Sequence, residues 1–188
     1  MFNNKWIAFF SHTGNEIYNV SKQIGRYPDA VVTNKTPGDT DVNKNLLNSS
    51  SKVTWVNDRP SAGEYQNIIN DIGRDCVITL HGWMRIIPKS VCKENRIYNL
   101  HPGLITKYPE LAGADPQKRV VEHPDESRYK KVGCVIHEVI EQVDAGKVLM
   151  ERSTANVYPS IHTLTDVLHA MAGDMWVDFL TCYIDAPG

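Results

Sequence analysis

The fold of this chain is decided by residues 65–80, which read YQNIINDIGRDCVITL. Apolar residues stand at positions 65, 68, 69 and 72, and this i, i+3, i+4, i+7 spacing puts them on one face of an α-helix. The apolar run at 76–80 that follows is typical of a buried β-strand. A helix that leads into a buried strand indicates a crossover connection within a parallel sheet.

The first hundred residues continue this alternation of strands and helices. An apolar run at 6–10 ends at the turn Ser11-His12-Thr13-Gly14, and Ile17, Val20 and Ile24 then recur at helical spacing. A short helical turn is expected at 88–93. The strands expected in this half of the chain span residues 6–10, 30–33, 52–56, 76–80 and 97–100.

The second half adds two strands and a final helix. Strands at 134–139 and 147–150 flank the turn sequence Asp144-Ala145-Gly146, and apolar positions from 164 to 175 mark an amphipathic helix. The polar stretch 104–131 contains three prolines and reads as a long surface excursion with one short helix near 117–121. We therefore predict an α/β fold with a mostly parallel twisted sheet, helices on both faces and antiparallel C-terminal strands.

Composition limits the class of protein. The 188 residues are 41% hydrophobic and 22% charged, which is typical of one soluble domain, and we expect residues 1–188 to form a single domain. The 20 Lys and Arg against 22 Asp and Glu, with no basic block, argue against binding to nucleic acid. No apolar stretch approaches the roughly 20 residues that cross a bilayer, so no membrane span is expected.

The cysteines and the N-terminal residues predict the compartment. Cys76, Cys92, Cys134 and Cys182 show no metal-ligand spacing, and no charged region followed by a long apolar segment directs secretion. We expect reduced thiols in a cytoplasmic protein that holds no metal; metal ligation by the cysteines is the alternative.

Polar residues follow the strands at the positions where an open α/β sheet places its ligand crevice. They are Asn99 and His101, the segment 80–85, and Asp144. Asn99 and His101 are two apart, so in a strand they project to the same side. An amide donor beside an imidazole suits acyl transfer, and a nearby carboxylate would orient the imidazole. By spacing alone, Asn-x-His is also typical of a loop anchor, and Asp144 of an ordinary turn.

Four motifs strengthen the catalytic interpretation. In order, they are LHGWMRII at 80–87, NLHPGLITKYP at 99–109, GCVIHEV at 133–139 and DAG at 144–146. Together with the first strand, its turn and Asn34-Lys35, they resemble the glycinamide ribonucleotide formyltransferase family along nearly the whole chain. The resemblance implies a Rossmann-like formyltransferase fold and transfer of a formyl group from 10-formyltetrahydrofolate to an amine, without a metal. It places the activity in one-carbon metabolism and purine biosynthesis.

The resemblance also assigns roles to residues. The catalytic Asn, His and Asp of the family correspond to Asn99, His101 and Asp144. Asn99 and a protonated His101 would stabilise the tetrahedral oxyanion, while Asp144 keeps His101 charged and assists proton transfer through water. By the same resemblance, the folate donor would contact the side chains or backbone of Leu80, Trp83, Met84, Arg85, Ile86, Ile87, Val91, Ile140 and Glu141.

The acceptor side departs from the family pattern. The expected acceptor contacts are Thr13, Gly14, Asn15, Glu16, Gly82 and Pro102. Glu16 stands where the family has a neutral Asn, and its carboxylate would compete with a phosphate dianion bound at the helix N-terminus. Arg59 is the nearest counterpart of the phosphate-binding Arg of the family. The acceptor is therefore expected to be glycinamide ribonucleotide or another small amine, such as a nucleotide or a sugar.

Two other functions remain open at the level of the sequence. The same Asn, His and Asp could activate water and hydrolyse 10-formyltetrahydrofolate, although a regulatory domain would then be expected as well. A non-catalytic folate-binding protein is the other alternative, but a binder has no need of all three polar residues. The expected partners are the folate and a small amine, and the expected assembly is a monomer or a homodimer.

Overall fold

The computed structural model describes residues 4–73, 75–125 and 127–184. In this part of the chain, seven strands form one sheet in the order β3-β2-β1-β4-β5-β6-β7. Strands β1 to β5 are parallel, and β6 and β7 run antiparallel to their neighbours. The fold class predicted from the sequence is confirmed. The strands are β1 (Lys5–Phe10), β2 (Ala30–Thr33), β3 (Val53–Trp55), β4 (Cys76–His81), β5 (Arg96–His101), β6 (Lys131–Glu138) and β7 (Val148–Ala155).

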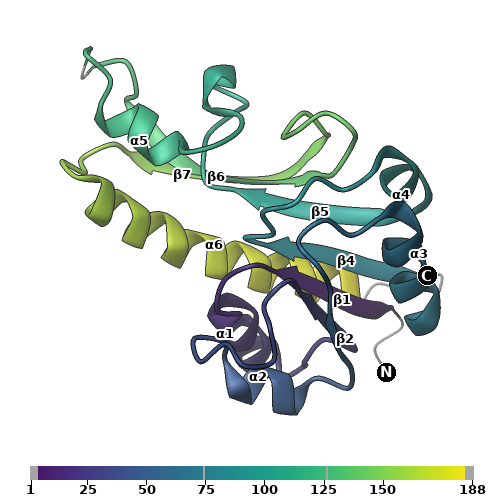
Figure 1. Cartoon of the computed structure of the whole chain (residues 1–188). Coiled ribbons are helices and arrows are strands. Elements are labelled where there is room, and N and C mark those ends of the chain that lie inside the picture. The colour runs from purple at the N-terminus through teal and green to yellow at the C-terminus, as the bar shows by residue number, and fades with distance from the viewer. Residues whose placement is uncertain (1–3, 74, 126, 185–188) are drawn as a thin grey trace.

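Helices cover both faces of the sheet (Figure 1). The helices are α1 (Asn15–Ile24), α2 (Lys44–Ser49), α3 (Ala62–Ile72), α4 (Lys89–Glu94), α5 (Pro116–Val121) and α6 (Ile161–Ile184), with a 3₁₀ turn, η1 (Pro109–Leu111). Helices α1, α2 and α6 pack on one face, while α3 and α4 pack on the other. The crossover helices therefore place the sheet between two apolar layers.

The two apolar cores follow from the alternation of side chains along β1. Trp6, Ala8 and Phe10 point toward α1 and α6, while Ile7 and Phe9 point toward α3 and α4. All five are essentially inaccessible to solvent. A strand that is apolar on both faces is the pattern of a central parallel strand, which the run at 6–10 had indicated.

The expected helix at 65–72 is confirmed as α3, which begins with a capping box. The Ser61 hydroxyl accepts a hydrogen bond from the Glu64 N–H, and the Glu64 carboxylate accepts one from the Ser61 N–H at 2.7 Å. Tyr65 and Ile69 of this helix are buried against the sheet. The helix therefore leads into the buried strand β4, as the sequence predicted.

Some elements differ from the sequence prediction in existence or length. Helix α2 was not predicted, because its six residues are too few for helical periodicity; Asn43 caps it by accepting a hydrogen bond from the Leu46 N–H at 3.0 Å. Strands β6 and β7 and helix α6 are longer than expected. The polar excursion after β5 is held by a small core of its own, formed by Leu104, Tyr108, Leu111 and Tyr129.

The topology creates a crevice where β1, β4 and β5 end. The chain passes from β1 outward to β2 and β3 and then returns to β4, so the sheet order reverses between β1 and β4. Ligands of open α/β sheets bind outside the carboxyl ends of the strands at such a point. Among the helices of the described residues, none is both long and apolar enough to cross a membrane.

Candidate active site

A cavity of about 530 Å³ lies at this switch point. That volume is within the range of small-molecule sites, about 300–1,000 Å³. His12 follows β1, residues 82–87 follow β4, and Asn99 lies near the end of β5. Residues 113–117 and 139–144 complete the wall. Segments that are far apart in the sequence thus converge on one cavity because the parallel strands end at the same edge.

Asn99 meets a histidine from the neighbouring strand. Asn99 of β5 and His137 of β6 are register partners, and the Asn99 Nδ2 lies 3.3 Å from the His137 Nε2. The His137 Nδ1 donates to the Glu138 carbonyl at 2.8 Å, and its Nε2 lies within 3.3 Å of both Asn99 and Asp144. The second amide N–H of Asn99 is then available to a ligand.

Asp144 joins two imidazoles. Its Oδ1 lies 3.3 Å from the His137 Nε2, its Oδ2 lies 3.2 Å from the His101 Nδ1, and the Gly113 N–H donates to Oδ2 at 2.8 Å. Burial raises the pKa of the Asp144 carboxyl, but His137, His101 and the Gly113 N–H together bring the pKa below its ordinary value. The carboxylate is therefore ionised. Asp144 also has a left-handed backbone (φ 52°), and such strain in a non-glycine residue is typical of functional sites.

His101 is almost fully enclosed beneath the cavity wall. Its side chain is 6% exposed, and its Nε2 donates to the Leu111 carbonyl at 2.8 Å. Burial lowers the pKa of His101, and this effect outweighs the Asp144 carboxylate and the Leu111 carbonyl, which raise it. Asp144 thus acts on the pKa of His101 in the expected direction, but burial opposes it more strongly. With Nε2 carrying its proton, Nδ1 is the basic atom of the neutral ring, and it faces Asp144.

We call Asn99, His101, His137 and Asp144 the polar cluster. Asn99, His137 and Asp144 line the cavity, whereas His101 lies behind them and touches Asp144. The sequence predicted three of these four residues. The fourth, His137, was not among the predicted site residues, but it lines the cavity. The alternation along β6 could have indicated this, because the buried Cys134 and Ile136 take the other face.

The predicted donor residues converge on the cavity with one exception. Val91 is 2% exposed and packs in the core with α3, so it does not line the cavity. Trp83 lines the wall and is fixed by donating from its Nε1 to the Tyr65 hydroxyl at 3.1 Å. The other donor residues in the cavity wall are Leu80, Met84, Arg85, Ile86, Ile87, Ile140 and Glu141.

The predicted acceptor residues divide into two groups. Gly82 and Pro102 line the cavity, whereas Thr13, Gly14, Asn15 and Glu16 form the start of α1 outside its wall. Glu16 is fixed in place, since its Oε2 lies 2.6 Å from the His81 Nδ1. His81 is itself held by Thr79, whose hydroxyl lies 2.9 Å from the His81 Nε2. A carboxylate of the protein thus lies at the positive end of α1.

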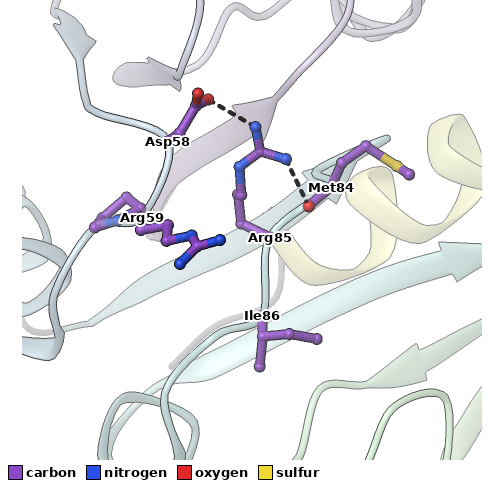
Figure 2. Close-up of a pocket in the computed structure, with 6 residues that line it drawn as sticks. Asp58, Arg59, Met84, Arg85 and Ile86 are labelled. Atoms are coloured by element: carbon purple, nitrogen blue, oxygen red, sulfur yellow. Dashed lines mark hydrogen bonds and ion pairs between the residues drawn. The ribbon is translucent and has the colours of Figure 1, made fainter.

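A second cavity of about 550 Å³ adjoins the first and shares Met84, Arg85 and Ile86 with it. Figure 2 shows Arg85 joined to Asp58 and to the Met84 carbonyl, at 2.7 and 2.9 Å. Arg85 and Asn34 hold the pKa of Asp58 below its ordinary value. The Arg59 guanidinium extends into the same space; among the described residues it forms no hydrogen bond or salt bridge, and its charge acts on the nearby Asp58. This cavity therefore offers a free positive charge.

Comparison with known proteins identifies the family. The profile of the family described as formyl transferase matches residues 15–175. The chain belongs to the formyl transferase family. This family match spans the polar cluster, residues 80–87 and 139–144 of the cavity wall, and most of the sheet.

Curated relatives match about half of the chain. A phosphoribosylglycinamide formyltransferase of Dictyostelium discoideum is 38% identical over 96 residues, which are 47% of this chain and 45% of that protein. A methionyl-tRNA formyltransferase of Thermotoga neapolitana is 31% identical over 96 residues, which are 50% of this chain and 26% of that protein. The chain thus aligns with less than half the length of these relatives.

Solved structures share the fold over nearly the whole chain. A phosphoribosylglycinamide formyltransferase of Coxiella burnetii superposes with a TM-score of 0.76 at 19% identity, covering 97% of this chain and 88% of that chain. A formyltetrahydrofolate deformylase of Pseudomonas syringae superposes with a TM-score of 0.77 at 17% identity, covering 97% of this chain and 62% of that chain. At these identities the likeness establishes the fold of this family member.

The side chains of the described residues do not form a metal centre. No group of three or more His, Cys, Asp or Glu in residues 4–73, 75–125 and 127–184 is arranged to hold a metal ion. The cysteines are free thiols, and burial raises the pKa of Cys76 to about 11 and that of Cys134 to about 12. These two thiols are therefore protonated at neutral pH and belong to the core.

Proposed function

We propose that this protein transfers the formyl group of 10-formyltetrahydrofolate to a small amine. The observation that supports this most is the polar cluster at the cavity wall, where an amide donor, a carboxylate and a buried neutral imidazole are linked by contacts of 3.3 Å or less. Acyl transfer needs a donor for the developing oxyanion and an acceptor for the proton that the amine loses, and the cluster supplies both.

Each member of the cluster has a distinct task. Asn99 donates its free amide N–H to the formyl oxygen as the nitrogen of the amine bonds to the formyl carbon. His101 takes up the proton of the amine by way of Asp144, which lines the cavity and lies 3.2 Å from the His101 Nδ1, and Asp144 stabilises the imidazolium that forms. When the bond between the formyl carbon and N10 of the folate breaks, that proton passes to N10. His137 orients both Asn99 and Asp144.

The apolar wall of the cavity supports the donor assignment. Six large apolar side chains are exposed among the described residues, and four of them, Met84, Ile86, Ile140 and Val143, line this cavity. Their exposed fractions run from 44% to 70%. Such a concentrated exposed apolar surface is typical of a ligand site, and the aromatic rings of a folate would cover it.

The second cavity supports binding of the anionic end of the donor. A folate carries carboxylates on its glutamate tail, at the end opposite to the pterin. The Arg59 guanidinium forms no hydrogen bond or salt bridge among the described residues, and the second cavity shares Met84, Arg85 and Ile86 with the first. A donor with its rings in the first cavity would extend these carboxylates toward Arg59, which can bind them bidentately.

Glu16 bears on the choice of acceptor. The Glu16 carboxylate, fixed by His81, puts a negative charge in the first turn of α1, where it would repel a bound anion. One N–H at this end is already occupied, because the Thr13 hydroxyl accepts a hydrogen bond from the Asn15 N–H at 3.2 Å. We therefore expect an acceptor that brings no phosphate to α1. Glycinamide riboside, which lacks the phosphate of glycinamide ribonucleotide, should then be the better substrate of this pair.

The experiment follows release of tetrahydrofolate from 10-formyltetrahydrofolate with and without a panel of amines that contains this pair. We expect release that depends on the amine and falls about 10²–10⁴-fold in the variants H101N and D144N. The matched control is the exposed pair of His162 and Asp166 on α6, which are 3.5 Å apart, and the variants H162N and D166N should keep full activity. Tetrahydrofolate release at the same rate with and without an amine would indicate hydrolysis instead. Normal turnover of H101N or D144N would refute the assigned roles.

A further inference from the structure

The segment 110–114 joins two members of the polar cluster through its backbone. The Leu111 carbonyl accepts the hydrogen bond from the His101 Nε2 at 2.8 Å. Two residues later, the Gly113 N–H donates to the Asp144 Oδ2 at 2.8 Å. The protonated nitrogen of His101 and the orientation of Asp144 therefore depend on where this short segment lies.

The segment has no regular structure beyond the 3₁₀ turn that ends at Leu111. Gly113 takes a left-handed conformation with φ at 86°, and the strand and helix ladders that fix other backbone groups do not extend into the segment. Its Leu111 side chain is buried in the small core of the loop. Something outside the segment must hold the backbone at residues 112–114.

Arg119 holds this backbone in place. From α5, its guanidinium donates to the carbonyls of Glu110, Ala112 and Ala114, the second at 2.9 Å. These are alternate residues, and the intervening Leu111 and Gly113 make the contacts with the cluster. A planar guanidinium has five N–H donors in a fixed fork, so one side chain can gather several carbonyls rigidly.

We propose that Arg119 is a positioning residue for the polar cluster, acting through the backbone of residues 110–114. This inference rests on the proposed function. Arg119 does not line the cavity, so it has no role in binding either substrate directly. Its effect reaches the chemistry through the Leu111 carbonyl and the Gly113 N–H.

The charge of Arg119 provides a specific readout. The charged and titratable groups that act on His101 are Asp144, His137 and Arg119, and Arg119 lowers the pKa of His101 in addition to the larger effect of burial. Removal of the guanidinium removes this repulsion. It also frees residues 110–114 to move, which exposes the His101 imidazole to solvent. Displacement of the Leu111 carbonyl would lower the pKa of His101, but burial is the largest effect on it, so the pKa should rise in the variant R119Q.

Arg128 and Lys118 offer matched controls. The Arg128 guanidinium lies 2.6 Å from the Glu110 carboxylate, so it anchors the same segment by a side chain and not by carbonyls. Lys118 precedes Arg119 on α5, and its exposed ammonium lies 3.9 Å from Glu122. The variants R128Q and K118Q lose a positive charge next to the segment but keep the three carbonyl contacts.

The test measures kcat, the KM for the folate donor, the pH profile and the thermal midpoint. In R119Q we expect kcat to fall between about 10- and 100-fold, the size of effect that a misplaced catalytic group produces, while the KM for the folate donor stays unchanged. The acid limb of the pH profile should move to higher pH, and added guanidinium ion should restore part of the rate. R128Q and K118Q should match the wild type.

The variant R119K distinguishes the effect of the guanidinium's several N–H donors from the effect of its positive charge. Its ammonium keeps the positive charge but cannot gather three carbonyls, so kcat should fall while the acid limb moves less than it does in R119Q. This variant also carries the test if R119Q does not fold. Unchanged kcat in both variants would overturn the proposal. So would a loss of rate with a lower thermal midpoint, no rescue by guanidinium and an unmoved pH profile, because that pattern indicates a general structural role.

An NMR titration of the His101 ring distinguishes this inference from the proposed function, because it needs no substrate. If the wild-type protein transfers no formyl group but the His101 pKa still rises in R119Q, the proposed function fails while the contact through residues 110–114 holds. If the wild type is active and the His101 pKa is the same in R119Q, the inference alone fails.

Discussion

Asp144 shows how one residue organises the site. Its carboxylate lies between His101 and His137, each 3.3 Å away or less, and its left-handed backbone turns the side chain back toward the sheet. The carboxylate stays ionised because its neighbours outweigh the effect of burial on its pKa. A buried negative charge beside a neutral imidazole stabilises the imidazolium that forms when a proton arrives, which is the state that amine attack requires.

The lowered pKa of His101 predicts the shape of the pH profile. The ring must be neutral to accept a proton, and its pKa lies below the ordinary value of 6.5. The value of kcat/KM should therefore be constant at neutral pH and should decline only as the pH falls through the lowered pKa. A pH–rate profile of the free enzyme checks this. A limb centred above pH 7 would mean that His101 is protonated at rest.

The variant D144N should move that limb in a defined direction. The Asp144 carboxylate raises the pKa of His101, so its loss should shift the acid limb to lower pH while kcat falls by about 10²–10⁴-fold. The pH–rate profiles of D144N and the wild type, measured side by side, test whether Asp144 acts on His101. An acid limb that moves to higher pH would show that Asp144 does not interact with the ring as the distances indicate.

The sequence predicted Asn99, His101 and Asp144, because their motifs could be recognised without coordinates. It did not predict the part of His137, since a lone histidine on a strand becomes a neighbour of Asn99 only when the antiparallel register is known. The protonation of His101 was also beyond the sequence. It depends on burial beneath a loop whose position no local pattern encodes.

Two glycines test the packing of the elements. In β6, a methyl group at Gly133 would lie 2.0 Å from the Arg152 carbonyl oxygen of β7, whereas one at Gly173 in α6 would meet nothing within 4 Å. G133A should therefore lower the free energy of unfolding by at least about 1–3 kcal/mol. G173A should raise it by about 0.5–1 kcal/mol, because alanine favours the helix. Chemical denaturation of both variants measures the difference. Equal stabilities would contradict the packing of β6 against β7.

For helices and strands, repeating apolar spacing predicted which elements form better than it predicted how long they are. The helix at 65–72 and the buried strands were evident because their apolar spacing repeats over several positions. Helix α2 has six residues and only Leu46 is buried, so its capping residue Asn43 was the one local signal. The full length of α6 depends on tertiary contacts with α1 and the sheet.

In the molecule as a whole, the polar cluster lies at the crevice that the strand order creates. The reversal of strand order between β1 and β4 leaves a crevice, and the change from parallel to antiparallel pairing at β5 and β6 brings His137 opposite Asn99. The cavity with the polar cluster and the cavity with Arg59 lie side by side because both are built on residues 84–86 after β4. A long donor could therefore occupy both cavities at once.

Binding of the donor should stabilise the whole fold. A ligand that binds only the native state raises the free energy of unfolding by about 2.7 kcal/mol at 100 times its Kd. A non-reactive folate analogue should produce this shift in the wild type and in H101N, since His101 does not line the cavity. The variant R59Q should need a higher concentration of analogue. No stabilisation of the wild type would exclude the cavity as a folate site.

The destination of the formyl group tests the central claim most directly. The protein is mixed with 10-formyltetrahydrofolate that carries isotopic label in the formyl carbon, together with the amine panel, and the labelled products are separated. We predict label in an N-formyl amine, formed together with an equal amount of tetrahydrofolate. Label recovered as formate, or a donor that remains intact with every amine, would contradict the account.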